Sequence, residues 1–285
     1  MVAILARNDV LEHHPPAGHQ QLSTNGSNWL FTVTSIFGVA TLAFFVLQLK
    51  PRGGERFFHY LFLIASFAGL ITYYAQASNL GWILVTQAHE LDRSGALRQI
   101  FWPKYYFWAV EFGAVVLALG VLSGVSWATI LFHVALSWIW VASYDTAAAT
   151  ETNFKWGFFA FGTLALLFLL AGTLRDGLAS AARVGVAKGD YAALAGWVAL
   201  LWIQYPLAWG LTDGGNYLGV TPGFIWFGVL DVLLTVGTGV ALVAFFARRW
   251  DYGRLNIAFT QYGRVAHQPG TFPEKDAPAP AAAAA

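Results

Sequence analysis

The sequence predicts an all-α protein, a single bundle of seven transmembrane helices, and three observations indicate this class. Hydrophobic residues make up 57% of the 285 residues and charged residues only 11%, and the mean hydropathy is +0.55. A soluble domain of that composition would be difficult to keep in solution. Seven stretches are apolar and long enough to cross the hydrocarbon core, which takes about 20 residues of helix. Polar and helix-breaking residues separate these stretches.

The predicted spans follow one another along the chain. The first two are joined at Pro51-Arg52-Gly53-Gly54, and the third follows a polar run from Gln87 to Arg98. Only Ser123-Gly124-Val125-Ser126 separates the third span from the fourth, and connections this short are ordinary between antiparallel neighbours. The later joints are Asp145 to Asn153, Arg175 to Asp190 and Asp213 to Asn216. The spans are roughly 29–49, 58–79, 102–123, 126–144, 154–174, 191–211 and 222–247.

Three segments make up the predicted organisation: an extracellular N-terminal tail over 1–28, the membrane domain over 29–250 and a cytoplasmic tail over 251–285. His13, His14 and His19 fall in the N-terminal tail, which we expect to be flexible, and no metal site is predicted there. Prolines and a terminal alanine run after Gln268 predict a disordered C-terminus.

The distribution of Lys and Arg predicts the orientation in the membrane. Cytoplasmic loops carry an excess of these residues, so the N-terminus is predicted outside and the C-terminus inside. The predicted cytoplasmic side carries Lys50, Arg52, Arg56, Arg175, Arg183, Lys188, Arg248, Arg249 and Arg254, and the other side mainly Arg7, Arg93, Arg98, Lys104 and Lys155. A formal net charge of +1 argues against a nucleic-acid partner. The absence of cysteine excludes disulfides and thiolate metal sites.

One acid lies inside the last predicted span, in the run Leu230-Asp231-Val232 that continues to Val236-Gly237. A charged group within a bilayer is costly, so Asp231 is a candidate functional residue. The chain's lysines, at positions 50, 104, 155, 188 and 275, all lie outside this span. Thr235 stands four residues after Asp231.

The sixth predicted span carries an aromatic pattern around a proline. Trp202, Tyr205 and Trp209 are three and four residues apart, so they lie near one helical face. Pro206 frees a backbone carbonyl, which a neighbouring helix can satisfy in a membrane bundle. In a chain with 13 tryptophans, aromatic residues at helical spacing arise by chance. The aromatic pattern is followed by the Asp231 segment, however, and chance is a poor explanation for the two motifs in this order.

The third predicted span contains Lys104, Trp108 and Glu111, and Glu111 is its only acid. Two interpretations of Glu111 stay open. It either faces the bundle interior and only fixes packing through a hydrogen bond, or it is a buried carboxyl that senses protons. His133, in the fourth span, has no histidine at metal-ligand spacing and is interpreted as a packing residue.

These segments resemble the microbial rhodopsins, and among them the fungal opsin-related proteins that lack the retinal-binding lysine. The resemblance extends over all seven spans, including Lys155-Trp156-Gly157 at the start of the fifth. In that superfamily the residue four places after the aspartate of the last helix is the lysine that binds retinal as a Schiff base. Thr235 stands at that position here.

The resemblance implies a retinal pocket that lacks the residues needed to bind retinal covalently and to transfer protons. Trp108, Trp202, Tyr205 and Trp209 would line a vestigial retinal pocket, and no covalent retinal or other cofactor is expected. Matched on Trp108, the family's arginine corresponds to Lys104, its proton acceptor to Phe107 and its proton donor to Ala118. Light-driven pumping is excluded on this basis, because lysine, acceptor and donor are missing together. The resemblance also implies that Asp231 interacts with Lys104 and accepts hydrogen bonds from Tyr205 and from Tyr74, or Tyr73 immediately before it.

The leading functional hypothesis is a retinal-free, non-pumping opsin-related protein of the fungal plasma membrane, without enzymatic activity. The resemblance to stress-induced yeast members implies a regulatory role through other membrane proteins such as the plasma-membrane proton ATPase. The bilayer is the other expected partner, and association of several copies is compatible with the sequence. The alternative is a receptor for a small apolar ligand, including a retinoid held without a covalent bond. An ion channel using Glu111 and Asp231 is a weaker alternative, because aromatic side chains should plug the centre. A filled central pocket would favour the interaction protein, and an open slot would favour the receptor.

Overall fold

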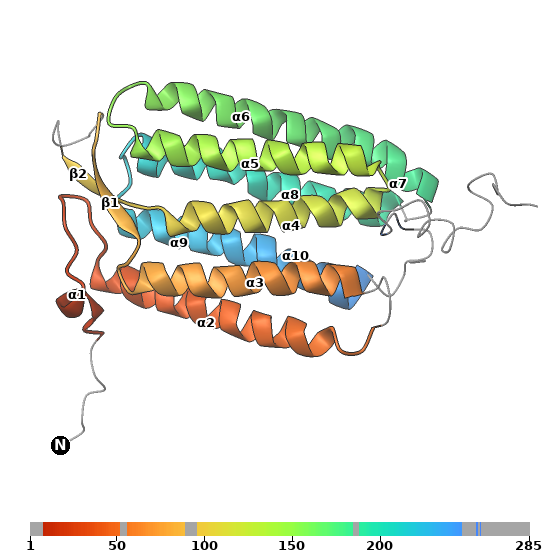
Figure 1. The fold of residues 1–285 in the computed structure, drawn as a ribbon, viewed down its shortest axis with the longest axis horizontal. Helices are drawn as coiled ribbons and strands as arrows, with labels where there is room; N and C mark the ends of the chain where they lie inside the picture. Colours follow the sequence, from red (N-terminus) through yellow and green to blue (C-terminus); the bar gives the residue numbers. More distant parts are fainter. Residues whose placement is uncertain are drawn as a thin grey trace, which may run out of the picture.

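The computed structural model describes residues 8–51, 56–88, 96–184, 188–246, 255 and 257. Within this part of the chain, seven helices are long and apolar enough to cross a membrane, which confirms the predicted bundle (Figure 1). Their cores are α2 (Thr24–Leu47), α3 (Arg56–Ala77), α4 (Pro103–Ser123), α5 (Trp127–Ala149), α6 (Lys155–Ala171), α8 (Lys188–Trp209) and α9 (Val220–Asp231).

Helix α4 is the central element of the bundle. It packs against α3 and α5 and also against α7 and α8. Of its apolar window 78% is buried, whereas the other six spans bury 33 to 56%. A side chain on almost any face of α4 therefore lies inside the protein, and both Trp108 and Glu111 are fully buried.

The short connection between α4 and α5 forms as the sequence predicts. Gly124 adopts a left-handed conformation with φ of 68°, which ends α4 without the steric cost that a Cβ would bring. Two residues later, the Ser126 side chain accepts a hydrogen bond from the backbone N–H of Thr129 at 3.2 Å and caps α5. The chain thus reverses direction within the predicted joint.

Three of the helices continue through wider π-helical turns. Helix α6 passes through η2 (Gly172–Gly177) into α7 (Leu178–Val184), and α8 ends in η3 (Gly210–Gly214). Helix α9 continues through η4 (Val232–Gly237) and α10 (Thr238–Val240) into η5 (Ala241–Phe246). Such turns are frequent at functional sites. Here η3 contains Asp213, and η4 begins directly after Asp231 and contains Thr235.

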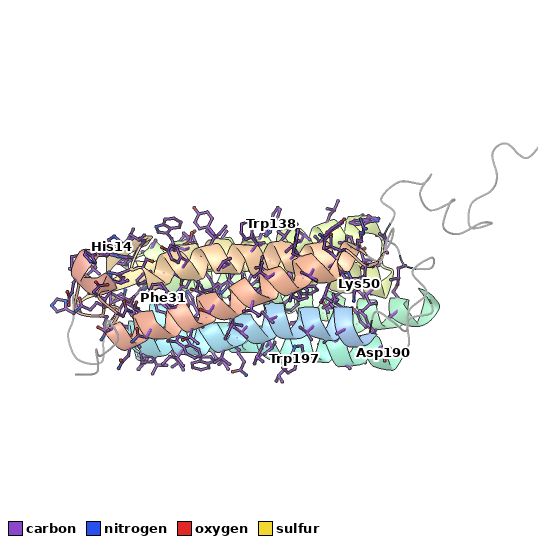
Figure 2. The ribbon with its side chains drawn as sticks, turned by 90° about the horizontal axis from the view of Figure 1, so that it is seen from below. His14, Phe31, Lys50, Trp138, Asp190 and Trp197 are labelled. Atoms are coloured by element: carbon purple, nitrogen blue, oxygen red, sulfur yellow. The ribbon has the colours of Figure 1, made fainter. Side chains whose placement is uncertain are left out.

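The outer surface of the bundle is apolar, as lipid contact requires. Figure 2 shows Trp138 and Trp197 on opposite sides of the bundle, and His14 at the opposite end from Lys50 and Asp190. Both tryptophans turn their indole N–H inward: Trp138 donates to the Ala109 carbonyl at 3.0 Å and Trp197 to the Thr238 hydroxyl at 3.2 Å. Their polar atoms are satisfied within the protein while the rings remain partly exposed.

A two-stranded antiparallel sheet covers one end of the bundle, which we call the hairpin end. Strand β1 (Trp82–Thr86) pairs with β2 (Leu97–Phe101), with Trp82 opposite Phe101. The sequence placed these residues in a joint and did not predict strands. The apolar run before Gln87 is too short for a span, and the run around Arg98 mixes polar and apolar residues without a clear alternation. The sequence therefore does not predict that these two runs pair as strands.

The N-terminal residues 8–23 pack on this hairpin, although a flexible tail was expected through residue 28. They include the short helix α1 (Val10–His13), and α2 already begins at Thr24, where Ser23 caps it. Their polar groups bind backbone that a two-stranded sheet leaves unpaired: Gln20 bridges β2, and the backbone N–H of Leu97 donates to His19 Nδ1. The His14 ring lies 2.9 Å from the Ser78 carbonyl. Residues 1–7, and all of the predicted tail 251–285 except 255 and 257, lie outside the described residues.

Candidate functional site

Asp231 ends α9 in the middle of the bundle and is fully buried. Its Oδ1 accepts hydrogen bonds from the Tyr205 hydroxyl at 2.7 Å and from Trp108 Nε1 at 3.2 Å. Its Oδ2 accepts a hydrogen bond from the Tyr73 hydroxyl at 2.5 Å. Three helices, α3, α4 and α8, thus each contribute one donor to this carboxyl. Hydrogen bonds of this kind offset part of the cost of an acid in a bilayer.

Tyr73, and not Tyr74, is the α3 partner of Asp231. Tyr73 is 2% exposed, whereas Tyr74 is 58% exposed and packs its ring edge-on against Phe31 at 6.3 Å. Successive residues of a helix project about 100° apart, and on α3, which has one face on the outside of the bundle, this rotation turns Tyr73 inward and Tyr74 outward. The assignment of Tyr74 to the polar core is therefore wrong, and the alternative residue Tyr73 takes its place.

Glu111 on α4 is connected to Asp231 through the hydroxyl of Tyr205. Its Oε1 accepts a hydrogen bond from the Thr235 hydroxyl at 2.5 Å, and its Oε2 lies 3.4 Å from the Tyr205 hydroxyl. Tyr205 therefore stands between Glu111 and Asp231. We call these five residues, Tyr73, Glu111, Tyr205, Asp231 and Thr235, the central cluster. Thr235, expected at the lysine position, points its hydroxyl at Glu111.

Aromatic rings fill the space around the central cluster. The ring of Phe112 stacks on Trp140 at 4.5 Å between centroids and meets Tyr205 edge-on at 4.9 Å. It also lies 6.1 Å from Trp108 and 6.3 Å from Trp202. These are the separations of directly packed aromatic side chains. Three of the predicted pocket residues, Trp108, Trp202 and Tyr205, therefore come together around Phe112, which the sequence did not single out.

Trp202 and Trp209 differ in their surroundings. The Trp202 indole N–H is buried and has no hydrogen-bond partner within the described part of the chain. Trp209 lies nearer the hairpin end: its ring packs 5.1 Å from Tyr144, and its Nε1 donates to the Tyr105 hydroxyl at 3.0 Å. Trp209 therefore joins the aromatic core to a second polar cluster.

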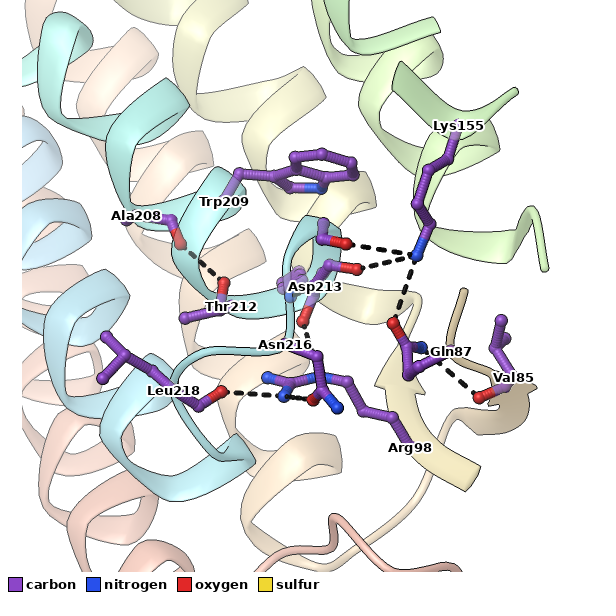
Figure 3. Close-up of polar contacts among 12 residues, drawn as sticks. Val85, Gln87, Arg98, Lys155, Ala208, Trp209, Thr212, Asp213, Asn216 and Leu218 are labelled. Carbon is purple, nitrogen blue, oxygen red and sulfur yellow. Dashed lines mark hydrogen bonds and ion pairs between the residues drawn. The ribbon is translucent and has the colours of Figure 1, made fainter. Parts of the chain in front are cut away.

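This second cluster, the Asp213 cluster, centres on the carboxylate of Asp213 in η3 (Figure 3). Arg98 Nε lies 3.3 Å from Asp213 Oδ1, while Lys104 Nζ and the Tyr105 hydroxyl both bind Oδ2. Burial lowers the pKa of Arg98 below its ordinary value, and the Asp213 charge opposes that shift. Both ion pairs are buried, because Arg98, Lys104 and Asp213 are between 1 and 5% exposed.

Lys104 is therefore the partner of Asp213, and the predicted ion pair between Lys104 and Asp231 is wrong. Lys104 precedes Trp108 by one turn toward the hairpin end of α4, and Asp213 follows α8 at that same end. Asp231 lies deeper, at the level of Trp108, whose indole it binds. The sequence reasoning missed Asp213 because Thr212-Asp213-Gly214-Gly215 has the composition of a turn. The available signal was its position four residues after Trp209 on an aromatic helix.

Further hydrogen bonds of Arg98, and those of a third buried cation, Lys155, connect the elements at the hairpin end (Figure 3). Arg98 Nη1 donates to Asn216 Oδ1 and to the Leu218 carbonyl, both at 2.8 Å. Lys155 Nζ donates to Gln87 Oε1 at 3.1 Å and to the Asp213 carbonyl at 3.2 Å. These hydrogen bonds fix three segments to the connection between α8 and α9: strand β2 through Arg98, the start of α6 through Lys155, and the end of β1 through Gln87. The cavity lined by Arg98, Lys104 and Asp213 has a volume of only about 10 Å³, close to the minimum for one water molecule.

A seven-helix bundle whose last helix holds a buried aspartate between tyrosines and a tryptophan defines a protein of the microbial rhodopsin type. The chain belongs to the family of bacteriorhodopsin-like proteins, whose family model matches residues 25–248. It is 31% identical over 269 residues to Protein FDD123 of Trametes versicolor, covering 93% of each chain. It is 30% identical over 262 residues to the opsin-like protein carO of Fusarium fujikuroi, covering 88% of this chain and 84% of that one.

Solved structures and a more distant relative extend the comparison. The light-driven proton pump LR (Mac) from Leptosphaeria maculans superposes with a TM-score of 0.75 at 28% identity, covering 80% of this chain and 97% of that one. The 30 kDa heat shock protein of Saccharomyces cerevisiae is 24% identical over 256 residues, covering 81% of this chain and 75% of that one. The chain is thus similar both to pumps and to a protein named for stress.

Proposed function

We propose that this chain is a fungal-type opsin-related membrane protein that works without retinal and does not pump ions in light. The observation that carries this proposal is the packing of Phe112. Its ring contacts Trp108, Trp140, Trp202 and Tyr205, the last of them at 4.9 Å, and so occupies space among the residues expected to enclose a chromophore.

The residues at the positions of the family's photochemical groups support the same proposal. Thr235 offers a hydroxyl, which cannot form a Schiff base, and that hydroxyl is engaged with Glu111 at 2.5 Å. Phe107, at the expected acceptor position, packs against Phe37 and Tyr73 at 5.3 and 5.9 Å. Ala118, at the expected donor position, carries no titratable group.

An absorption spectrum of the purified full-length protein after incubation with all-trans retinal tests this part of the proposal. We expect no band to the red of free retinal and no covalent adduct after borohydride reduction. The pump LR (Mac), treated in parallel, controls for active retinal. A red-shifted band with a reduced adduct on this chain would refute the proposal.

For the cellular role, we propose regulation during stress through other proteins of the plasma membrane, such as the proton-pumping ATPase, with the N-terminus outside and no enzymatic activity. The similarity to a heat shock protein supports the link to stress, and the excess of Lys and Arg on one side supports the orientation.

The test is acidification of the medium by a fungal strain that lacks its own opsin-related proteins. Cells that express this chain should differ from empty-vector cells in glucose-driven acidification after heat stress, equally in light and darkness. Equal acidification with and without the chain would contradict a role through the ATPase, and a difference seen only in light would contradict the retinal-free mechanism.

One observation favours a second candidate, a receptor for a small apolar ligand with a hydrogen-bond acceptor. The buried indole N–H of Trp202 is unpartnered among the described residues, and an unpaired buried donor costs about 1–3 kcal/mol. A ligand that accepts this hydrogen bond would raise the melting temperature of the wild-type protein but have less effect on Trp202→Phe. A channel is the weakest candidate, because packed rings surround both central carboxyls.

A further inference from the structure

We propose that Glu111 and Asp231 form a proton-binding site in the centre of the bundle, in which Glu111 holds one proton and Asp231 carries the negative charge. The inference goes beyond the proposed function, since it does not depend on retinal, on stress or on a partner. It rests on the hydrogen-bond geometry of the central cluster and on the charges that face it.

The position of the Tyr205 proton decides which acid is protonated. Tyr205 has one hydroxyl hydrogen, and its oxygen lies 2.7 Å from Asp231 Oδ1 but 3.4 Å from Glu111 Oε2. The shorter contact has the length of an ordinary O–H···O bond, so Tyr205 donates to Asp231. If Glu111 were ionised, its Oε2 would then face the lone pairs of Tyr205. A carboxylic acid at Glu111 would instead donate its own proton to them.

The remaining contacts fit the same assignment. Asp231 receives hydrogens from Tyr73, Trp108 and Tyr205, which suits an ionised carboxylate that can only accept. Glu111 accepts a hydrogen bond only from Thr235, at Oε1, so among the described residues its Oε2 faces no closer donor and is free to carry a proton. Every hydroxyl of the cluster then has both a donor role and a defined partner.

The charges around the central cluster also favour one proton on the two carboxyls. The groups that bind the two carboxyls from α3, α4, α8 and η4 are Tyr73, Trp108, Tyr205 and Thr235, all neutral donors. Lys104, on α4, is engaged with Asp213 and lies over the rings of Tyr105 and Phe227, 5.0 Å from each centroid. Two ionised carboxyls would place two like charges in a low-dielectric interior, and among the described residues only neutral donors bind them. A proton on Glu111 removes that repulsion, as protonation of one member does in other carboxyl pairs.

Infrared spectroscopy of the full-length protein in lipid nanodiscs at neutral pH tests the assignment. The wild type should show the carbonyl-stretch band of a protonated carboxylic acid, with the small shift expected in D₂O. Glu111→Gln should remove the band. Thr235→Val should keep the band but move it to higher frequency, because the carbonyl of Glu111 loses its donor. The matched control is Glu151→Gln, the same change at an exposed residue, which should leave the protonated-carboxyl band unaltered.

Proton linkage provides an independent measurement. Above about pH 4.3 a glutamate in the unfolded chain is ionised, so the folded chain binds one proton more than the unfolded chain. The folding equilibrium constant should then fall tenfold per pH unit from this residue alone, so stability is lost as pH rises. Glu111→Gln should remove that factor between about pH 6 and 8, whereas Glu151→Gln should not.

Three results would overturn the proposal. The first is a wild-type spectrum without a protonated carboxyl band, and the second is a band that survives Glu111→Gln. The third is an unchanged pH dependence of stability in Glu111→Gln. If Glu111→Gln does not accumulate as folded protein, the wild-type band and its shift in Thr235→Val decide the question. An unshifted band in Thr235→Val would then count against Glu111 as the proton carrier.

Discussion

The ion pairs of the Asp213 cluster allow a quantitative prediction about stability. Asp213→Asn keeps the size of the side chain but leaves Arg98 and Lys104, both buried, without a carboxylate. Removing one partner of a buried ion pair costs about 3–5 kcal/mol, because the other charge remains buried. Lys104→Met is expected to cost less, about 1.5–3 kcal/mol, because Asp213 keeps Arg98 and the Tyr105 hydroxyl and loses only one charged hydrogen bond.

The double variant distinguishes a real ion pair from two independent sites. In Lys104→Met with Asp213→Asn, only Arg98 is left without the carboxylate, so the loss should be smaller than the sum of the single losses by about 1–3 kcal/mol. The measurement is the free energy of unfolding in detergent for the wild type, both single variants and the double variant. All four proteins should be compared at one pH and one salt concentration.

The control cycle combines Lys104→Met with Asp231→Asn. Since Asp231 binds Tyr73, Trp108 and Tyr205 rather than Lys104, its coupling to Lys104 should be the smaller of the two. Additivity within about 0.5 kcal/mol for Lys104 and Asp213, or a larger coupling for Lys104 and Asp231, would refute the reasoning.

Three further predictions follow from single residues. Tyr73→Phe should lower the free energy of unfolding by about 1–3 kcal/mol, because a hydrogen bond to Asp231 is lost, whereas Tyr74→Phe should change it by no more than about 0.5 kcal/mol. Equal effects of the two variants in thermal unfolding would contradict the assignment of Tyr73 as the partner of Asp231. Phe112→Ala should cost about 3–5 kcal/mol through the cavity it opens, and the same variant should bind retinal without a covalent bond better than the wild type, as measured by tryptophan quenching. Thr235→Lys with added retinal should not acidify the medium in light, because Phe107 accepts no proton; sustained, protonophore-sensitive acidification would argue the opposite.

The sequence determined the elements that depend on local composition. A continuous apolar run of about 20 residues crosses lipid as a helix, which satisfies its backbone hydrogen bonds internally, whereas the strands of a membrane barrel are only about 9–11 residues long; this predicted the bundle and its seven spans. The same argument identified Asp231 and Glu111 as residues that need partners, since an acid within a span is costly wherever the chain places it. Gly124 and Ser126 likewise marked the turn between α4 and α5 from their own chemistry.

Apart from Tyr205, which the family resemblance implied as a partner of Asp231, only the tertiary structure decided which partners these residues have. Tyr73 and Tyr74 are equivalent in composition, and the rotation of α3 turns one toward Asp231 and the other outward. Lys104 binds Asp213 because the end of α8 lies beside the start of α4, a proximity between residues 109 positions apart. No spacing rule predicts such a contact, since hydrogen bonds and ion pairs act over a few ångströms and depend on how whole helices pack. Composition decides that a buried polar group must be satisfied, and packing decides by which residue.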